Sequence, residues 1–310
     1  MKLSLSTNWC NRRYSSGEEI VDKALSLGID ELELGFHTSK EQVDGFKKCS
    51  AKISIGSVHA FCPVPIGAPG GYPELYSLAS FDESMRLLAR THVKKNIAFA
   101  AEMGADTLVL HAGRVAFSGL FEVLDSSVLR QTLEKSRGDT SARGYRKLLS
   151  SALALRVRRG RKMLELFSKE LEALIPDLER YGVTLALENL PYLEGFPNED
   201  EMVELRSRFA NVPVKAWFDT GHDRVRYMHA WTACSTMRLM ERVEDFQGMH
   251  LNDVVDFNDD HLPPGDGKVD FVALKPFAKR MRHVVLEPSG AVSDESLRKG
   301  IEYIRKVWEI

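Results

Sequence analysis

The sequence predicts an α/β protein, a (β/α)₈ TIM barrel with a basic helical insertion after its fourth strand. Short apolar runs rich in β-branched residues alternate with longer amphipathic stretches along all 310 residues, and eight such units can be counted. This alternation is typical of a parallel sheet covered by helices. With 44% apolar residues, the chain can fill one large core. We therefore expect one barrel domain over residues 1–310, with the insertion at residues 114–162.

Four strands are expected in each half of the chain. Those of the first half begin at Lys2 (KLSLSTNW), Glu31 (ELELGF), Ile53 (ISIGSVHAF) and Thr107 (TLVLHAG). Those of the second half begin at Thr184 (TLALENL), Val214 (VKAWFDTGH), Phe246 (FQGMHLNDV) and His283 (HVVLEPSG).

Between the strands, apolar residues recur at helical spacing. We expect helices over Glu18–Leu27, Ser84–Met103, Met163–Tyr181, Asn198–Phe209 and Ser293–Trp308. A glycine follows three of these stretches, where a helix commonly ends in a left-handed residue: Gly28, Gly104 and Gly182. The competing fold is an open doubly wound sheet, which normally carries a glycine-rich phosphate turn after its first strand. The segment NWCNRRYSSG is not such a turn.

Two segments interrupt the alternation. Cys62–Phe81 is rich in Pro, Gly and Tyr and follows the third strand, so it forms either a lid over the strand ends or an ordered surface loop. The insertion holds eleven Lys and Arg residues against two acids between Arg130 and Lys162. Such a basic lobe binds a phosphate or carboxylate, contacts nucleic acid, forms a subunit interface, or is a solvated helical face. Its densest part supplies three candidate anion-binding residues, Arg156, Arg158 and Arg159.

Overall composition gives no indication of a nucleic-acid or membrane partner, of export, or of a fold held together by disulfides. The 42 basic and 44 acidic residues nearly cancel, so net charge requires neither nucleic acid nor a membrane surface as partner. Neither a signal peptide nor a run of about 20 apolar residues is visible, and we expect a cytoplasmic protein. The four cysteines are scattered and form no CxxC pair, which argues against a disulfide framework and a zinc knuckle: Cys10, Cys49, Cys62 and Cys234.

Six consecutive predicted strands end in a residue that can bind a metal ion. These residues are His59, His111, Glu188, Asp219, His250 and Glu287. In a parallel barrel all strand C-termini open on one face, so the six side chains are expected to converge around one mouth. A single Glu or His is commonly a salt-bridge partner or a core residue, and only the convergence predicts a metal site.

Three further candidates lie just beyond the strand ends. His222 lies in DTGH, and Asp259 and His261 lie in DDHLPPGDG, where Gly and Pro predict a tight loop. Each can present carboxylate or imidazole to the same mouth. The remaining histidines lie off this pattern and are given no role: His37, His92, His229 and His283.

Five motifs surround these residues: LALEN (Leu185–Asn189), FDTGH (Phe218–His222), MHLND (Met249–Asp253), HLPPGDGKVDF (His261–Phe271) and VVLEP (Val284–Pro288). Together they resemble the xylose-isomerase-like TIM barrel superfamily, which contains sugar isomerases and epimerases and also the endonuclease IV type of abasic-site nuclease. The resemblance covers nearly the whole barrel except the basic insertion.

The resemblance implies a ligand set. In the isomerases and epimerases, residues matching Glu188, Asp219, His250 and Glu287 bind one divalent cation. In the nucleases five more ligands join them to hold three zinc ions, and the matching residues here are His59, His111, His222, Asp259 and His261. We expect Mn²⁺, Mg²⁺ or Co²⁺ if one ion binds, and Zn²⁺ if the histidine cluster is also filled.

The resemblance and the residues together predict a divalent-metal-dependent isomerase or epimerase of a sugar or sugar derivative. Glu188 and Glu287 would exchange a substrate proton through an enediolate. The alternative is an endonuclease IV-like zinc phosphodiesterase that acts on abasic DNA. A catalytically silent binding barrel is disfavoured because all nine metal-type residues are retained. The expected partner is a small sugar substrate, with nucleic acid only under the alternative, and the sequence leaves a homo-oligomer open.

Overall fold

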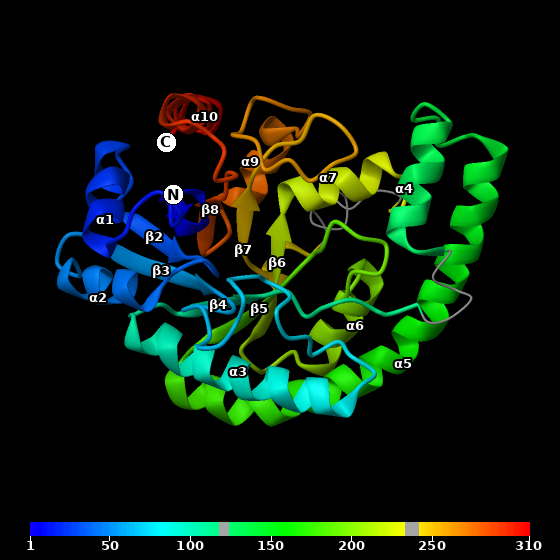
Figure 1. The fold of residues 1–310 in the computed structure, drawn as a ribbon, viewed down its shortest axis with the longest axis horizontal. Helices are drawn as coiled ribbons and strands as arrows, with labels where there is room; N and C mark the ends of the chain where they lie inside the picture. Colours follow the sequence, from blue (N-terminus) through cyan, green and yellow to red (C-terminus); the bar gives the residue numbers. More distant parts are fainter. Residues whose placement is uncertain (118–123, 233–241) are drawn as a thin grey trace.

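Eight parallel strands close into a barrel in the computed structural model, which describes residues 1–117, 124–232 and 242–310 (Figure 1). Each strand pairs with the next along the chain, and β8 pairs with β1, so no edge strand is left. The predicted TIM barrel is confirmed. Its strands are β1 (Ser4–Ser6), β2 (Glu31–Leu34), β3 (Ser54–His59), β4 (Thr107–Leu110), β5 (Thr184–Glu188), β6 (Val214–Asp219), β7 (Phe246–Leu251) and β8 (His283–Leu286).

Helices surround this barrel (Figure 1). They are α1 (Gly17–Ser26), α2 (Lys40–Lys48), α3 (Glu83–Glu102), α4 (Ser126–Lys135), α5 (Arg143–Tyr181), α6 (Glu199–Arg208), α7 (Thr220–Met228), α9 (Phe271–Ala278) and α10 (Asp294–Trp308). Short 3₁₀ turns cover Thr7–Trp9 (η1) and Val243–Asp245 (η3). Within the described residues, no helix is both long and apolar enough to cross a membrane.

Local sequence signals explain where several helices begin and end. Ser16, Ser39 and Asn198 each form a capping box with the residue three positions later, which satisfies two backbone N–H groups of the first turn. The glycines after α1, α3 and α5 have φ of 73°, 80° and 65°, the left-handed conformation that was predicted for them. The helices α2, α7 and α9 were not anticipated, because each has only eight or nine residues and too few turns to show a clear period.

The inside of the barrel is filled in layers. Val109, Ala186, Trp217 and Val285 form an apolar plug at its centre. Gly248 on β7 makes room for the indole, because a Cβ atom there would overlap the Trp217 ring. Side chains alternate inward and outward along a strand, so the residue two positions after each plug residue points inward one layer closer to the strand C-termini. This next layer carries the ionisable groups described below.

The insertion after β4 is helical, as predicted. Its second half is continuous with the helix expected at Met163–Tyr181, and α5 runs without a break through 39 residues. No helix-breaking sequence separates the two parts, and Gly160 is accommodated inside the helix. α4 packs on the first half of α5 around a small apolar core at the side of the barrel (Figure 1). Residues 118–123 of the insertion, and Cys234, lie outside the described residues.

Arg156 on α5 is buried, with only 2% of its surface exposed. Its guanidinium forms a bidentate pair with Glu201 on α6, at 2.6 and 2.7 Å, and donates to the carbonyl oxygens of Leu193 and Gly195. A Cβ atom on Gly160 would collide with the Glu201 carboxylate, so the glycine permits this pair. Arg156 thus joins α5 to α6 and to the segment that follows β5.

Replacing Arg156 with alanine should lower the free energy of unfolding by about 3–5 kcal/mol, because it leaves the Glu201 carboxylate buried without its partner. Arg158→Ala, at an exposed position two residues along the same helix, should change it by less than about 0.5 kcal/mol. Equilibrium unfolding in urea measures both. Similar stabilities for the two variants would contradict the structural role given to Arg156.

Candidate metal centre

Four buried side chains meet at the mouth of the barrel: Glu188, Asp219, His250 and Glu287. They come from the ends of β5, β6 and β7 and from the residue after β8, and a ligand atom of each lies within 4.8 Å of the others. His250 Nδ1 is 3.3 Å from a Glu188 oxygen and 3.1 Å from a Glu287 oxygen. The structure therefore brings the four predicted residues together, and we call them the central group.

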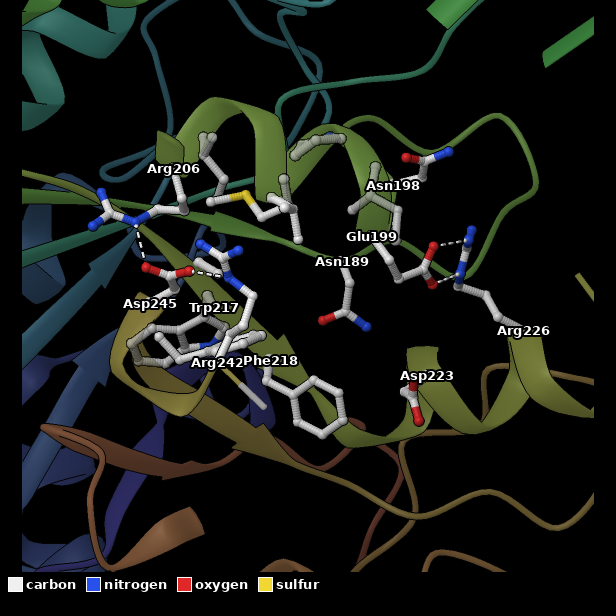
Figure 2. Close-up of a pocket in the computed structure, with 17 residues that line it drawn as sticks. Asn189, Asn198, Glu199, Arg206, Trp217, Phe218, Asp223, Arg226, Arg242 and Asp245 are labelled. Atoms are coloured by element: carbon white, nitrogen blue, oxygen red, sulfur yellow. Dashed lines mark hydrogen bonds and ion pairs between the residues drawn. The ribbon is translucent and has the colours of Figure 1, made fainter. Parts of the chain in front are cut away.

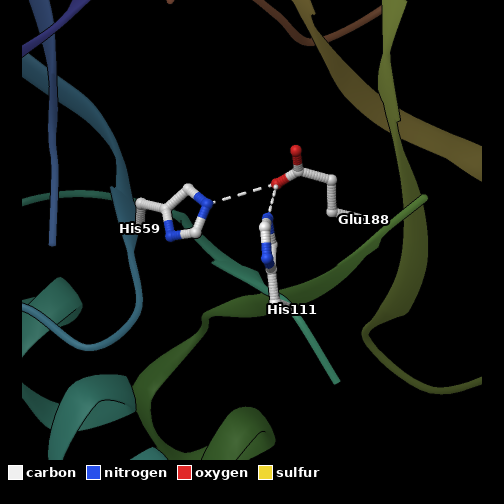
Figure 3. Close-up of side chains that lie close together, drawn as sticks. All are labelled: His59, His111 and Glu188. Carbon is white, nitrogen blue, oxygen red and sulfur yellow. Dashed lines mark hydrogen bonds and ion pairs between the residues drawn. The ribbon is translucent and has the colours of Figure 1, made fainter. Parts of the chain in front are cut away.

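Glu188 also contacts a second set of residues (Figure 3). Its Oε2 lies 3.2 Å from His59 Nε2 and 3.3 Å from His111 Nε2, while its Oε1 faces His250. The two imidazoles come from the end of β3 and from the residue after β4. The Glu188 carboxylate is thus shared between the central group and this histidine pair.

The remaining three candidates form a third group beside the first. One oxygen of Asp259 lies 3.2 Å from His222 Nε2, and the other lies 3.4 Å from His261 Nε2. His222 also faces the central group, because its Nδ1 is 3.4 Å from a Glu188 oxygen. All nine residues singled out in the sequence therefore belong to three adjoining groups.

Three of the five imidazoles are oriented by backbone carbonyls. Nδ1 contacts the carbonyl oxygen of Ala60 at 2.8 Å in His59, that of Asn189 at 2.8 Å in His222, and that of Glu287 at 2.9 Å in His261. A carbonyl can only accept, so Nδ1 of each of these rings donates, and Nε2 is the ring nitrogen that can bind a metal ion when it is unprotonated.

In the other two imidazoles, His250 and His111, a carboxylate faces the ring nitrogen that does not face Glu188. Both oxygens of Glu33 lie close to His250 Nε2, at 3.0 and 3.2 Å, which leaves Nδ1 for the central group. An oxygen of Glu74, in the segment after β3, is 3.7 Å from His111 Nδ1. Carboxylates placed behind imidazoles in this way fix the ring and raise its basicity toward a metal.

Glu33 and Glu74 were both missed in the sequence. Glu33 is fully buried in the middle of β2, where Ser57 also donates a hydrogen bond to it at 2.8 Å. The sequence signal for Glu33 is a charged residue inside a predicted strand, between Leu32 and Leu34, which are both buried. Because Glu33 lies inside a strand, the pattern of ionisable residues at strand ends does not include it. Glu74 gave no comparable signal, because its place depends on how a long loop folds back.

The electrostatics of the cluster favour positive charge. Burial alone would lower the pKa of His111, but the charge and hydrogen bond of Glu188 outweigh burial and raise it to about 9. Against the same effect of burial, Asp219 and Asp259 raise the pKa of His222 to about 10. Burial would raise the pKa of Glu188, yet the histidines hold it well below its ordinary value. A divalent cation supplies the same positive charge in place of protons.

The donor set of the central group fits a divalent cation. Three carboxylates surround one imidazole, and all four side chains are at most 5% exposed. Buried carboxylates that outnumber their cationic partners cost free energy unless a positive charge compensates them. Mixed oxygen and imidazole ligands are those that Zn²⁺, Mn²⁺ and Co²⁺ accept.

The cluster opens on a cleft of about 500 Å³ at the barrel mouth. Asp259, His261 and Glu287 line one part of the cleft, and Asn8, Arg12 and His37 line another. Asn8 Nδ2 donates to Glu287 Oε1 at 3.1 Å and so orients that carboxylate. His37, which had been given no role, therefore lies at the site after all.

Figure 2 shows a second, small cavity of about 70 Å³ on the outer side of β5 and β6. Glu199 pairs with Arg226 in its wall, and Asp245 pairs with Arg206 and Arg242. Its lining includes none of the nine candidate ligands. This cavity is separate from the candidate metal centre.

The arginines of the insertion lie apart from the cleft that adjoins the central group. Arg156 makes four hydrogen bonds to protein groups, Arg158 is exposed, and the Arg159 guanidinium lies 4.5 Å from the centre of the Phe81 ring. Anion binding at this place stays a prediction that rests on Arg158 and Arg159.

Comparisons with known proteins agree with this geometry. A family model described as xylose isomerase-like TIM barrel matches residues 21–307. No curated protein gives a significant match. Among solved structures, a D-tagatose 3-epimerase-like protein superposes with a TM-score of 0.67 at 17% identity, over 100% of this chain and 97% of that chain.

Two further structures share the fold. A D-psicose 3-epimerase from Clostridium cellulolyticum H10, solved with D-tagatose, gives a TM-score of 0.65 at 15% identity over 100% of both chains. The IOLI protein, solved with a zinc atom, gives 0.66 at 14% identity over 100% of this chain and 98% of that chain. At these identities the likeness establishes the fold alone.

The contact between Glu33 and His250 predicts how the central group responds to substitution. Glu33→Gln should weaken binding of Zn²⁺ or Mn²⁺ about 10- to 100-fold, because the imidazole loses the charged partner that raises its basicity. Isothermal titration calorimetry on the apoprotein measures the affinity. The matched control is Glu31→Gln on the same strand, whose carboxylate instead contacts Ser4 and Ser54. Equal affinities for the two variants would show that Glu33 does not support the metal site.

Proposed function

The chain belongs to the xylose isomerase-like TIM barrel family, and on that premise we propose that it is a divalent-metal-dependent isomerase or epimerase of a sugar or sugar derivative. The observation that carries the proposal is the central group, in which three buried carboxylates and one imidazole converge beside a cleft. The sugar epimerases among the structures of the same fold support it. So does the zinc atom in the IOLI protein.

Glu188, Asp219, His250 and Glu287 would hold the cation. When bound, the cation polarises adjacent oxygens of the substrate and acidifies the C–H bond next to the carbonyl. The protein itself must then take up a proton and return it at another position or on another face of the sugar.

We assign the first of these proton transfers to Glu287. Its Oε2 faces His250 Nδ1 at 3.1 Å, and its Oε1 accepts a hydrogen bond from Asn8, which lines the cleft. Oε1 is therefore the Glu287 oxygen that would face a sugar in the cleft. Asn8 orients the carboxylate without neutralising it, so Glu287 remains able to accept a proton.

We assign the second transfer to Glu188. It lies on β5, three strands away from the Glu287 position after β8, so the two carboxylates approach a substrate from different sides. The histidines hold the pKa of Glu188 well below its ordinary value despite burial, so the carboxylate is ionised before the reaction. The proton that it returns to the sugar must therefore reach it from a protonated imidazole, and His111 Nε2 lies 3.3 Å from its Oε2. Low exposure of both carboxylates excludes bulk water from the proton path.

One observation favours a second candidate function, a zinc phosphodiesterase that acts on abasic DNA. The nine candidate ligands form three adjoining groups, two of which share Glu188, and a site for three ions needs three such groups. Under this function His59, His111, His222, Asp259 and His261 bind metal, whereas under the first they contact sugar hydroxyls or water.

We expect the Mn²⁺-loaded protein to exchange a carbon-bound proton with solvent deuterium on at least one member of a panel of ketoses, keto acids and sugar phosphates. Glu287→Gln should slow this exchange about 100- to 10,000-fold, because it removes the proton acceptor. The control is Glu302→Gln at an exposed position on α10. Mass spectrometry or ¹H NMR follows the exchange, and equal rates for both variants would remove Glu287 from the proton path.

The two candidate functions predict opposite results on DNA. The isomerase predicts exchange on a sugar and no cleavage of an oligonucleotide that carries an abasic site. Three tightly held zinc ions, cleavage of that oligonucleotide and no exchange on any sugar would instead replace the first proposal by the second. Zinc content by mass spectrometry and a gel assay of the oligonucleotide decide between them.

A further inference from the structure

We infer that the substrate carries an anionic group, a phosphate or a carboxylate, and that the guanidinium of Arg12 binds this group in the cleft beside the central group. The inference rests on the proposed function, because it takes the cleft to be the place where the sugar binds. It adds the chemical class of the substrate, which the metal-binding residues alone do not determine.

Arg12 carries a positive charge that the protein leaves uncompensated. Its side chain is exposed in the cleft, where its guanidinium hydrogen-bonds to the ring of His37 at 3.4 Å. Among residues 1–117, 124–232 and 242–310, no carboxylate lies within 4.0 Å of this guanidinium. Arginine presents several N–H donors in one plane, and a phosphate or carboxylate can accept two of them together.

The neighbouring Arg13 shows what a structural arginine looks like in the same turn. It pairs with Asp294 at 3.2 Å, donates to the carbonyl oxygens of Trp9 and Val292, and lies over the Trp9 ring at 4.2 Å. Its donors connect the start of the chain to the segment before α10. Within the described part of the chain, Arg12 forms no ion pair or carbonyl hydrogen bond of this kind, and its side chain contacts the His37 ring instead.

His37 does not neutralise Arg12 either. Burial, and then the charge of Arg12 itself, lower the pKa of His37 to about 4, so the ring is neutral near pH 7. A neutral ring can accept a hydrogen bond from the guanidinium through Nε2. His37 therefore holds the arginine side chain in place and leaves its charge available to a ligand.

A short chain of contacts connects Arg12 to the central group. Asn8 Nδ2 donates to Glu287 Oε1 at 3.1 Å, and Asn8 Oδ1 accepts from the backbone N–H of His37 at 3.4 Å. His37 in turn contacts Arg12. A single small molecule can therefore reach both the Glu287 carboxylate and the Arg12 guanidinium.

The two parts of the cleft have opposite charge. Asp259, Asp260 and Glu287 line the part next to the candidate ligands, and Arg12 lies in the other part. A molecule whose hydroxyl and carbonyl oxygens face the central group, and whose anionic end faces Arg12, matches both parts. A neutral sugar would leave the guanidinium with solvent alone.

A binding experiment on three ketohexoses tests this inference. D-fructose, D-fructose 6-phosphate and D-fructuronate have the same number of carbons and differ in the anionic group, and an abasic oligonucleotide provides a DNA phosphate. Calorimetric titration of each into the Mn²⁺-loaded protein gives the preference for an anion. We expect at least one anionic sugar to bind more tightly than D-fructose, with a preference that weakens as salt is added.

Arg12→Gln should reduce this preference about 10- to 100-fold, because it removes the charge-assisted hydrogen bonds. Arg12→Lys should keep part of it, since the charge remains and the two-pronged geometry is lost. Arg298→Gln is the matched control, because Arg298 is exposed on α10 and outside the cleft lining.

Each other outcome overturns the inference in a distinguishable way. If neutral and anionic sugars exchange deuterium and bind alike, or if Arg12→Gln keeps the preference, the inference fails and the proposed function stands. If the abasic oligonucleotide alone depends on Arg12, the anion is a DNA phosphate and the sugar assignment fails. If no sugar binds or exchanges at all, the proposed function fails and the inference fails with it.

Discussion

The burial of carboxylates at the mouth of the barrel is the constraint on which the rest of the site depends. Glu33, Glu188, Asp219 and Glu287 are all at most 5% exposed and surround the single imidazole of His250. So much negative charge in so small a volume is stable only when positive charge accompanies it. Backbone carbonyls that contact Nδ1 of three histidines, and the carboxylates of Glu33 and Glu74, orient the imidazoles. One nitrogen of each ring is thereby directed toward the place where a cation would bind.

The sequence predicted the barrel and the nine candidate ligands because both follow from one regularity. Parallel strands end on one face, so a residue such as Asp219 or His250 at a strand end must point to a common mouth. Glu33 was missed because it lies within β2, where its inward direction depends on the register of the closed barrel. The length of α5 was missed for a similar reason, since the contact of Arg156 with Glu201 joins residues that are far apart in the chain.

Arg12 and Arg156 show why charge in a sequence does not locate an anion site. The dense cluster around Arg156 attracted attention, yet its buried member is occupied by Glu201 and backbone carbonyls. Arg12 faces the cleft, and among the described residues its guanidinium contacts the neutral His37 ring and no carboxylate. An arginine can bind a ligand when protein groups do not already occupy its guanidinium. The number of arginines near it in the sequence does not decide this.

The central claim is that a divalent cation compensates the buried carboxylates of the central group. Anomalous diffraction from crystals soaked in Mn²⁺ or Zn²⁺, with data above and below the absorption edge, tests it most directly. The account predicts a peak bounded by Glu188, Asp219, Glu287 and Nδ1 of His250. Saturating metal that gives no peak among these four side chains would contradict it.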